Sequence, residues 1–188
     1  MRKTLKNYFT PLLLLGIVIV SLFWIQNLPV RNAKKILTNL LNIPSQPLVE
    51  AYHIMDMDID DYIKSPHKQT IASLDDAPLR EAYKDMLGNL VSDSFVEECI
   101  RLNEIAYLHD LAIKQDFTIK LKKLDILKTN QKDTFLYEAQ IFIHTSTGKE
   151  QEFQITGKIQ FSNNGKVSSV SLRGRELQRF IENELNET

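Results

Sequence analysis

The chain contains a single cysteine, Cys99, among its 188 residues, so it can form no internal disulfide. Any folded domain must therefore be stabilised by an ordinary hydrophobic core, for which the roughly 110 residues of the C-terminal part suffice. Cys99 lies among apolar neighbours on a predicted helix, and free cysteine is one of the most frequently buried residue types. We predict that Cys99 packs in the core and is not a reactive or crosslinking thiol.

Acidic residues are absent from the first 49 positions, which hold six Lys or Arg, whereas the remainder carries 17 basic and 24 acidic residues. The formal net charge of −1 hides this asymmetry. Nucleic-acid binding depends on clustered Lys and Arg that displace phosphate counterions. Because the C-terminal part is acidic, we expect no direct contact with nucleic acid.

Catalytic sequence motifs are also missing. The sequence has no P-loop, no GxSxG and no HExxH, so ATP hydrolysis, esterase and zinc-protease functions lack support. The four histidines share no close spacing of the kind that a metal site needs. They are His53, His67, His109 and His144. The sequence predicts no metal and no cofactor.

One long hydrophobic run is present, from Tyr8 to Ile25, with no ionisable side chain besides Tyr8. As a helix it would cover roughly 27 Å, close to a bilayer core of about 30 Å. Cleavage after Ala33 would place Arg31 at the −3 position, where a signal peptide has a small residue. We therefore predict a retained signal-anchor with aromatic residues at both membrane interfaces. These interface residues are Tyr8, Phe9, Phe23 and Trp24.

Basic residues flank this run on both sides, so the positive-inside rule only weakly favours one membrane orientation over the other. The leading charges directly adjoin the apolar run, and the short N-terminus offers nothing to export. We predict a single-pass protein of the cell membrane with residues 1–7 in the cytoplasm and residues 8–25 in the bilayer. Residues 26–75 would form an amphipathic stalk and linker, and residues 76–188 an extracytoplasmic domain.

Within the predicted stalk, Asn32 to Asn42 has the pattern of a basic amphipathic helix that ends before Pro44. It would continue the membrane helix, lie on anionic lipid or pair with another copy, and the sequence leaves these alternatives open. A second helix follows, whose 4-3-4-3 apolar spacing must rest on the domain or on another protein. This apolar seam, a candidate interaction surface, consists of Leu48, Tyr52, Met55, Ile59 and Tyr62.

The same segment spaces Asp56, Asp58 and Asp60 by two, as an EF-hand loop spaces its ligands. The sixth position of such a loop, however, is Asp61 where glycine is needed, and the twelfth is His67 where glutamate is needed. We therefore favour the acidic face of a helix over a calcium site.

Helices open the predicted domain. Asp76 is placed to cap the first, and Ser94 with Glu97 forms a capping box for the second, which is apolar on most sides as far as Leu108. Beyond Gln115 the apolar period changes from 3.6 to 2, which indicates strands.

Four strands are predicted, and Asn164-Gly165 between the last two is the clearest hairpin signal. The first strand needs a bulge near Lys122 and Lys123, because its apolar parity shifts there. Helices followed by an antiparallel meander with one apolar face predict an α+β domain, in which the helices cover a curved four-stranded sheet. With a final helix over Glu176 to Leu185, we expect the fragment from Asp76 to Leu185 to fold alone.

The two clearest strands present apolar side chains and Tyr137 on their inward parity, and their charged and amide groups on the other. A helix-covered cone of this kind, as in ketosteroid isomerase, needs an inward carboxylate and proton donor for catalysis. Tyr137 is expected to be a core residue with a satisfied hydroxyl. No motif places a nucleophile beside His109 and Asp110, so we expect a buried, hydrogen-bonded histidine and no catalytic residue.

The order of elements, with Arg2, Lys3 and Lys6 before one span, then a stalk, helices and four strands, resembles a known class. It is similar to the nuclear-transport-factor-two-like domains of the eighth VirB component of type IV secretion systems. Among these it most resembles the TraH-type transfer proteins of Gram-positive conjugative plasmids. The resemblance covers nearly the whole chain and rests on architecture. The Asn-Pro-x-Gly signature of Gram-negative members is absent, so their oligomer contacts cannot be transferred.

The resemblance implies a non-enzymatic scaffold of a conjugative mating channel, which contacts other channel proteins through its outer domain and lipid through its N-terminal helix. An association between copies of the chain is left open. Two alternatives remain, a membrane-tethered small-molecule binder or isomerase that uses the mouth of the cone, and a surface adhesin or sensor stalk. Aromatic filling of the cone would argue against the first, and neighbouring genes would decide the second.

Overall fold

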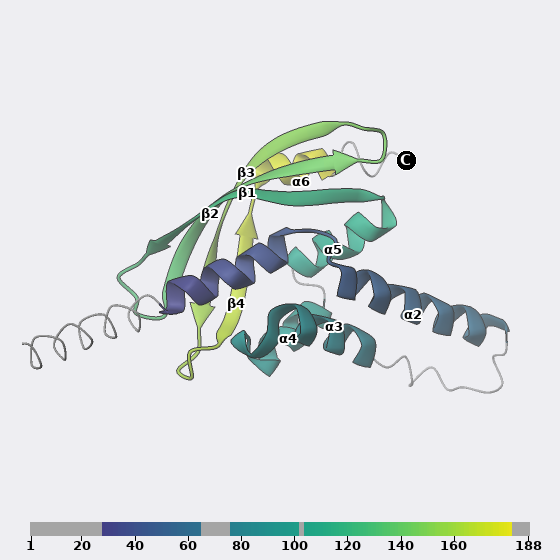
Figure 1. The fold of residues 1–188 in the computed structure, drawn as a ribbon, viewed down its shortest axis with the longest axis horizontal. Helices are drawn as coiled ribbons and strands as arrows, with labels where there is room; N and C mark the ends of the chain where they lie inside the picture. Colours follow the sequence, from purple (N-terminus) through teal and green to yellow (C-terminus); the bar gives the residue numbers. More distant parts are fainter. Residues whose placement is uncertain (1–27, 65–75, 102–103, 182–188) are drawn as a thin grey trace, which may run out of the picture. The chain divides into compact units, whose positions relative to one another are not determined.

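The computed structural model of the protein describes residues 28–64, 76–101 and 104–181 (Figure 1). Within these ranges no helix combines the length and the apolar character that a membrane span requires. The predicted span over residues 8–25 lies outside the described residues. The same holds for its interface residues, Tyr8, Phe9, Phe23 and Trp24.

The helical half of the fold begins with helical residues 28–41, which bury an apolar stripe from position 33 onward. This helix ends at Leu41, three residues before Pro44, which cannot continue it. The stripe consists of Ala33, Ile36, Leu37, Leu40 and Leu41, each at most 1% exposed. The helices that follow are α2 (Gln46–Lys64), α3 (Ala77–Leu87), the 3₁₀ turn η2 (Gly88–Leu90), α4 (Asp93–Ile100) and α5 (Glu104–Lys114).

The sheet has four strands in the order β1-β2-β3-β4, and each strand is antiparallel to its neighbour, which confirms the predicted meander. In the last hairpin Gly165 takes a φ of +75°, a conformation that favours glycine, as the Asn-Gly signal predicts. The elements are β1 (Phe117–Lys128), β2 (Thr134–Thr145), β3 (Glu150–Phe161), β4 (Val167–Arg173) and α6 (Arg175–Phe180).

The predicted inward face of the sheet is the buried face. A register shift between Leu121 and Lys123 confirms the bulge that restores apolar parity in β1. Helices lie along one side of the curved sheet, so the α+β architecture is confirmed (Figure 1). The buried hydrophobic side chains on the two central strands are Phe135, Tyr137, Ala139, Ile141, Ile143, Phe153, Ile155, Ile159 and Phe161.

Residues 33–55, which we predicted to be part of a stalk, instead belong to the domain. The compact unit that contains the sheet runs over residues 33–188. Asn39 Nδ2 donates a hydrogen bond of 2.6 Å to the carbonyl of Met86 on α3. An amphipathic stripe shows that a helix is buried on one face but does not name what buries it, so the sequence pattern was equally compatible with lipid or a second copy.

The chain after the first helix is also tied to the sheet. Ile43 N donates to the Ile119 carbonyl at 2.9 Å, and Ile119 N donates back to the Ile43 carbonyl at 2.7 Å. Leu121 N donates to Asn42 Oδ1 at 3.0 Å. The fragment from Asp76 to Leu185 therefore lacks one wall of the core and the strap on β1, so the folded unit has to start near residue 33.

The helix boundaries differ from the prediction at two places. The N-cap of α4 is Ser92, whose hydroxyl accepts a 3.2 Å hydrogen bond from Phe95 N, whereas Ser94 lies inside the helix. The predicted continuous helix is two helices, because α4 ends at Ile100 and α5 begins at Glu104. Asp76 does hold the N-cap position of α3, although its side chain makes no capping hydrogen bond.

Candidate functional site

The concave face of the sheet is occupied by aromatic side chains. Phe135 and Phe161 pack edge to face with ring centroids 5.6 Å apart. Phe153 packs on Phe180 of α6 at 5.2 Å. Phe117 is only 2% exposed at the start of β1. In the described part of the chain the interior of the cone is therefore filled by the protein itself.

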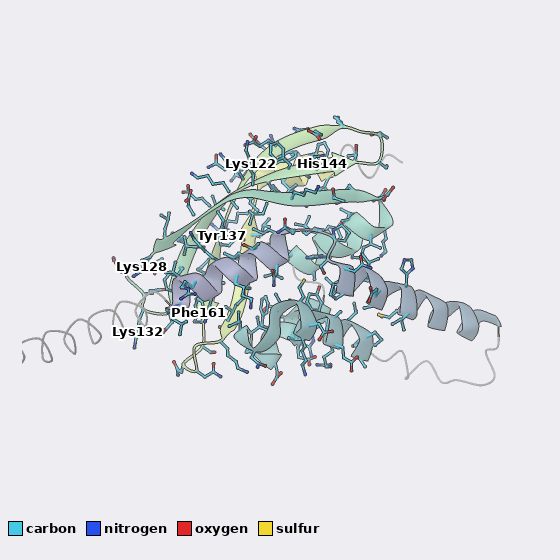
Figure 2. The ribbon with its side chains drawn as sticks, in the orientation of Figure 1. Lys122, Lys128, Lys132, Tyr137, His144 and Phe161 are labelled. Atoms are coloured by element: carbon cyan, nitrogen blue, oxygen red, sulfur yellow. The ribbon has the colours of Figure 1, made fainter. Side chains whose placement is uncertain are left out.

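Among the described residues, Tyr137 is the one buried side chain with a polar group on this face of the central strands. Its hydroxyl donates a 2.9 Å hydrogen bond to the carbonyl of Ser171 on β4, as expected for a core tyrosine. The ring crosses Gly157 of β3, where a Cβ would collide with both the Tyr137 ring and the Ser171 carbonyl. Burial, aided by the Glu104 charge, raises the pKa of Tyr137, so the hydroxyl stays a donor. Figure 2 labels Tyr137 on the helix side of the sheet.

His109 on α5 is fully buried, which confirms the prediction of a buried histidine. Its Nε2 lies 3.1 Å from the Leu40 carbonyl and must donate, because a carbonyl can only accept. The other ring nitrogen, Nδ1, is buried with no partner among the described residues. Burial lowers the pKa of His109 to about 4, although the bond to Leu40 opposes this shift. His109 is therefore neutral at physiological pH and joins α5 to the end of the first helix.

Asp110 and Cys99 complete the set of titratable candidates on the helices. Asp110 forms an ion pair with Lys114 one turn later on the same helix, at 2.9 Å. Cys99 is 1% exposed, as predicted. The adjacent residues His109 and Asp110 thus have different partners, a backbone carbonyl and an exposed lysine, and they do not form an acid–base pair with each other.

The first half of the apolar seam lies against the domain. Leu48 is fully buried, and Tyr52 and Met55 are half-buried on α2, which packs along α3. Burial, with a smaller contribution from the Asp110 charge, raises the pKa of Tyr52 to about 12. The side chains of Ile59 and Tyr62 lie outside the described residues, as do the acidic side chains of the calcium alternative.

A hollow of about 480 Å³ lies where α5, the end of β4 and α6 meet. We call it the α5–α6 hollow. Its polar lining comes from Glu104 and Tyr107 on α5 and from Arg173, Arg175 and Gln178. Its apolar lining consists of Leu108, Leu172, Leu177 and Ile181. The volume is within the range of about 300–1,000 Å³ that small-molecule pockets occupy.

The electrostatics of the hollow favour an anionic group. Glu104 Oε2 accepts a 2.9 Å hydrogen bond from Leu172 N, which occupies part of its acceptor capacity. Arg173 and Arg175 form no ion pair with any residue in the described ranges. Between them stands Gly174, where a Cβ would press on Ile155. Two guanidinium groups can pair with a carboxylate, and the apolar floor beside them can contact the hydrocarbon part of the same ligand.

Sequence reasoning missed this hollow. Its residues come from positions 104–108 and 172–181, which only the fold brings together. The only local signal is the Arg-Gly-Arg tripeptide at the junction of a strand and a helix, at Arg173 to Arg175. That signal is weak, because exposed arginines at the ends of elements are common.

Among the side chains that the structure describes, no cluster of three or more potential metal ligands occurs. Comparison with known proteins finds no matching family model, no similar curated protein and no similar solved structure. The function therefore has to be argued from the chain itself.

Proposed function

We propose that the protein is a single-pass membrane scaffold of a conjugative type IV secretion channel, which acts through protein–protein contacts and has no catalytic role. The proposal extends the resemblance to TraH-type transfer proteins and the eighth VirB component. The observation that carries it is the combination of an apolar run of 18 residues, Tyr8 to Ile25, with an α+β domain whose helices pack on a curved four-stranded antiparallel sheet.

The short connection between the run and the domain supports this role. Ala33, the first residue of the compact unit, stands eight residues after Ile25. At about 3.5 Å per residue, even a fully extended connection reaches only about 28 Å. A membrane-anchored chain of this kind would hold its domain within about one bilayer thickness of the membrane surface. Confinement near a surface raises the effective concentration of partners anchored in the same membrane.

Complementation of a deletion tests the proposal. We expect loss of the gene to reduce conjugative transfer strongly, and expression of residues 33–188 without the apolar run to leave it reduced. A chimera that replaces residues 1–25 with an unrelated single span of the same orientation should restore transfer, because the anchor acts by position. Restoration by the released domain, or normal transfer in the deletion strain, would contradict a tethered scaffold.

The predicted topology has its own measurement. Protease added to intact protoplasts should degrade the region after Glu50 while a cytoplasmic control protein survives. A domain that stays intact alongside that control would place it on the cytoplasmic side. An N-terminus of the mature protein after Ala33 would show that the run is cleaved and not retained.

The α5–α6 hollow favours a second candidate function, the binding of a small amphipathic carboxylate. The described aromatic side chains fill the interior of the cone, whereas the hollow combines Arg173 and Arg175 with an apolar floor. Titration calorimetry with decanoate would measure this activity. Arg173→Glu should abolish binding, whereas Lys158→Glu, an exposed charge reversal on the other face of the sheet, should not. Equal binding by both variants would remove this candidate.

A further inference from the structure

Two large apolar side chains are exposed side by side on the outer face of the sheet. Leu127 of β1 and Leu136 of β2 are direct partners in the strand register. Each is 45% exposed, and among the described residues the other large apolar side chains of similar exposure lie on helices. Exposed apolar side chains that adjoin one another, unlike single ones, mark a candidate interaction site.

The edge of β1 is covered along only half of its length. β1 is an outer strand of the sheet. Before the bulge, Ile43 bonds to both backbone groups of Ile119, and Asn42 accepts a hydrogen bond from Leu121 N. From the bulge onward no described residue outside the sheet bonds to its backbone. The covered half and the open half therefore meet at the bulge.

The geometry of the ladder determines which groups the open half presents. Both backbone groups of Ile119 point to the edge, because they bond to Ile43. The alternation of an antiparallel ladder, carried across the register shift, turns the groups of Leu124, Ile126 and Lys128 to the same edge. The open half thus offers unpaired donors and acceptors beside the exposed Leu127.

Lysines on an exposed edge usually block strand pairing, but two of those on β1 are engaged within their own sheet. Lys122 Nζ pairs with Glu152 at 3.1 Å and lies 4.7 Å from the Phe142 ring centroid. Lys123 Nζ pairs with Asp125 at 2.8 Å. Figure 2 shows Lys128 at the far end of the strand, next to the turn. The lysine charges at the bulge are therefore compensated within the sheet, whereas Lys128, at the end of the open half, forms no ion pair with a described residue.

The sequence of the open edge distinguishes between the two-fold registers available to a second copy. Centring on Asp125 sets two like carboxylates opposite each other, which is unfavourable. Centring on Ile126 sets Asp125 against Leu127. Centring on Leu127 sets Leu127 against its copy, with the Leu136 of each chain on either side, and pairs Ile126 with Lys128 by backbone hydrogen bonds. Only this last register forms an unbroken row of four leucines.

We propose that two copies of this chain associate by antiparallel pairing of their β1 edges about Leu127, which joins two four-stranded sheets into one. The pairing extends over the short segment from Asp125 to Thr129, because the chain turns away beyond it. Such a small contact gives weak association in dilute solution, so it is detected best by covalent capture. The inference rests on the sheet alone and not on the proposed transfer role.

Cysteine crosslinking of the full chain tests the register. In this pairing the two Leu127 Cα atoms form a non-hydrogen-bonded pair about 4.5 Å apart, within the range that a disulfide bridges. The two Leu136 positions are separated by three strand spacings, about 14 Å in total, which a disulfide cannot bridge. Leu127→Cys and Leu136→Cys therefore form a matched pair of equally exposed sites. The wild type, with its buried Cys99, provides the background.

We expect Leu127→Cys to give a disulfide-linked dimer under mild oxidation, and Leu136→Cys and the wild type to remain monomeric. Adding Leu136→Lys to the Leu127→Cys chain should lower the dimer fraction several-fold, because it breaks the leucine row. A monomeric Leu127→Cys chain, equal crosslinking at position 136, or no effect of the added lysine would each overturn the proposal. None of these results would alter the complementation outcome, so the two proposals fail separately.

Discussion

Acidification should weaken the packing of α5 against the first helix through His109. The imidazole is fully buried, and its pKa lies near 4 in the folded chain against a usual value of 6.5. The unfolded chain therefore takes up a proton at a higher pH than the folded chain. This contribution to stability is complete above pH 6.5 and is lost as the pH falls through 6.5 toward 4.

The magnitude follows from the two pKa values. Proton linkage at about 1.36 kcal/mol per pH unit gives a loss of about 1.8 kcal/mol in the free energy of unfolding between pH 7 and pH 5. Carboxylates also titrate at the lower end of this interval, so the wild type alone does not isolate the histidine. His109→Gln supplies the comparison, because its amide can donate to the Leu40 carbonyl but does not titrate.

Urea unfolding of residues 33–188, followed by circular dichroism at several pH values, measures the difference. The wild type should lose about 1.8 kcal/mol more than His109→Gln between pH 7 and pH 5. The m-values should agree, since the same surface is exposed on unfolding. Parallel pH profiles for the two proteins would show that His109 has an ordinary pKa in the fold, and the burial argument would then be wrong.

Four further changes test the packing of the domain. Leu40→Ala should lower the free energy of unfolding by about 2–5 kcal/mol, because it removes part of the core. The fragment from residue 76 to 185 lacks the whole first helix and should not melt cooperatively. A cooperative melt of that fragment would contradict the docking of the first helix. Gly157→Ala should lower the free energy of unfolding by about 3 kcal/mol or more, because the added Cβ clashes with Tyr137. Gly148→Ala is the control: its Cβ meets open space, so it should cost only about 1 kcal/mol, from the positive φ at that position. Ile141→Asp should abolish the fold in far-UV spectra while Gln140→Asp on the outer face leaves it intact; the reverse result would invert the assigned faces.

The sheet was predictable from the sequence because its signals are local. Period-2 alternation identifies the inward face of β2 and β3 residue by residue, and the Asn-Gly pair at Gly165 places the last turn. The bulge in β1 follows from the same rule, since two apolar sets of opposite parity on one strand can share a face only if an extra residue lies between them.

The helix contacts and the hollow were not predictable because they depend on residues far apart in sequence. His109 and Leu40 are 69 positions apart, and nothing in either neighbourhood names the other. Glu104 meets the Leu172 backbone across a similar distance, so the α5–α6 hollow exists only after β4 returns to α5. A polar residue inside an apolar stripe, such as His109, indicates that some partner exists but not which one.

The strap formed by Ile43 on β1 also has a mechanical consequence. Any tension that enters the domain at its N-terminal end reaches helical residues 33–41 first and then the paired hydrogen bonds between Ile43 and Ile119. Because the stripe of that helix is buried and its end is bonded to the sheet, load would pass directly into the core without first extending a slack linker. A pull on this end would therefore unfold the domain by peeling the helix from the sheet, with Leu40 and the Ile43 strap as the first points of resistance.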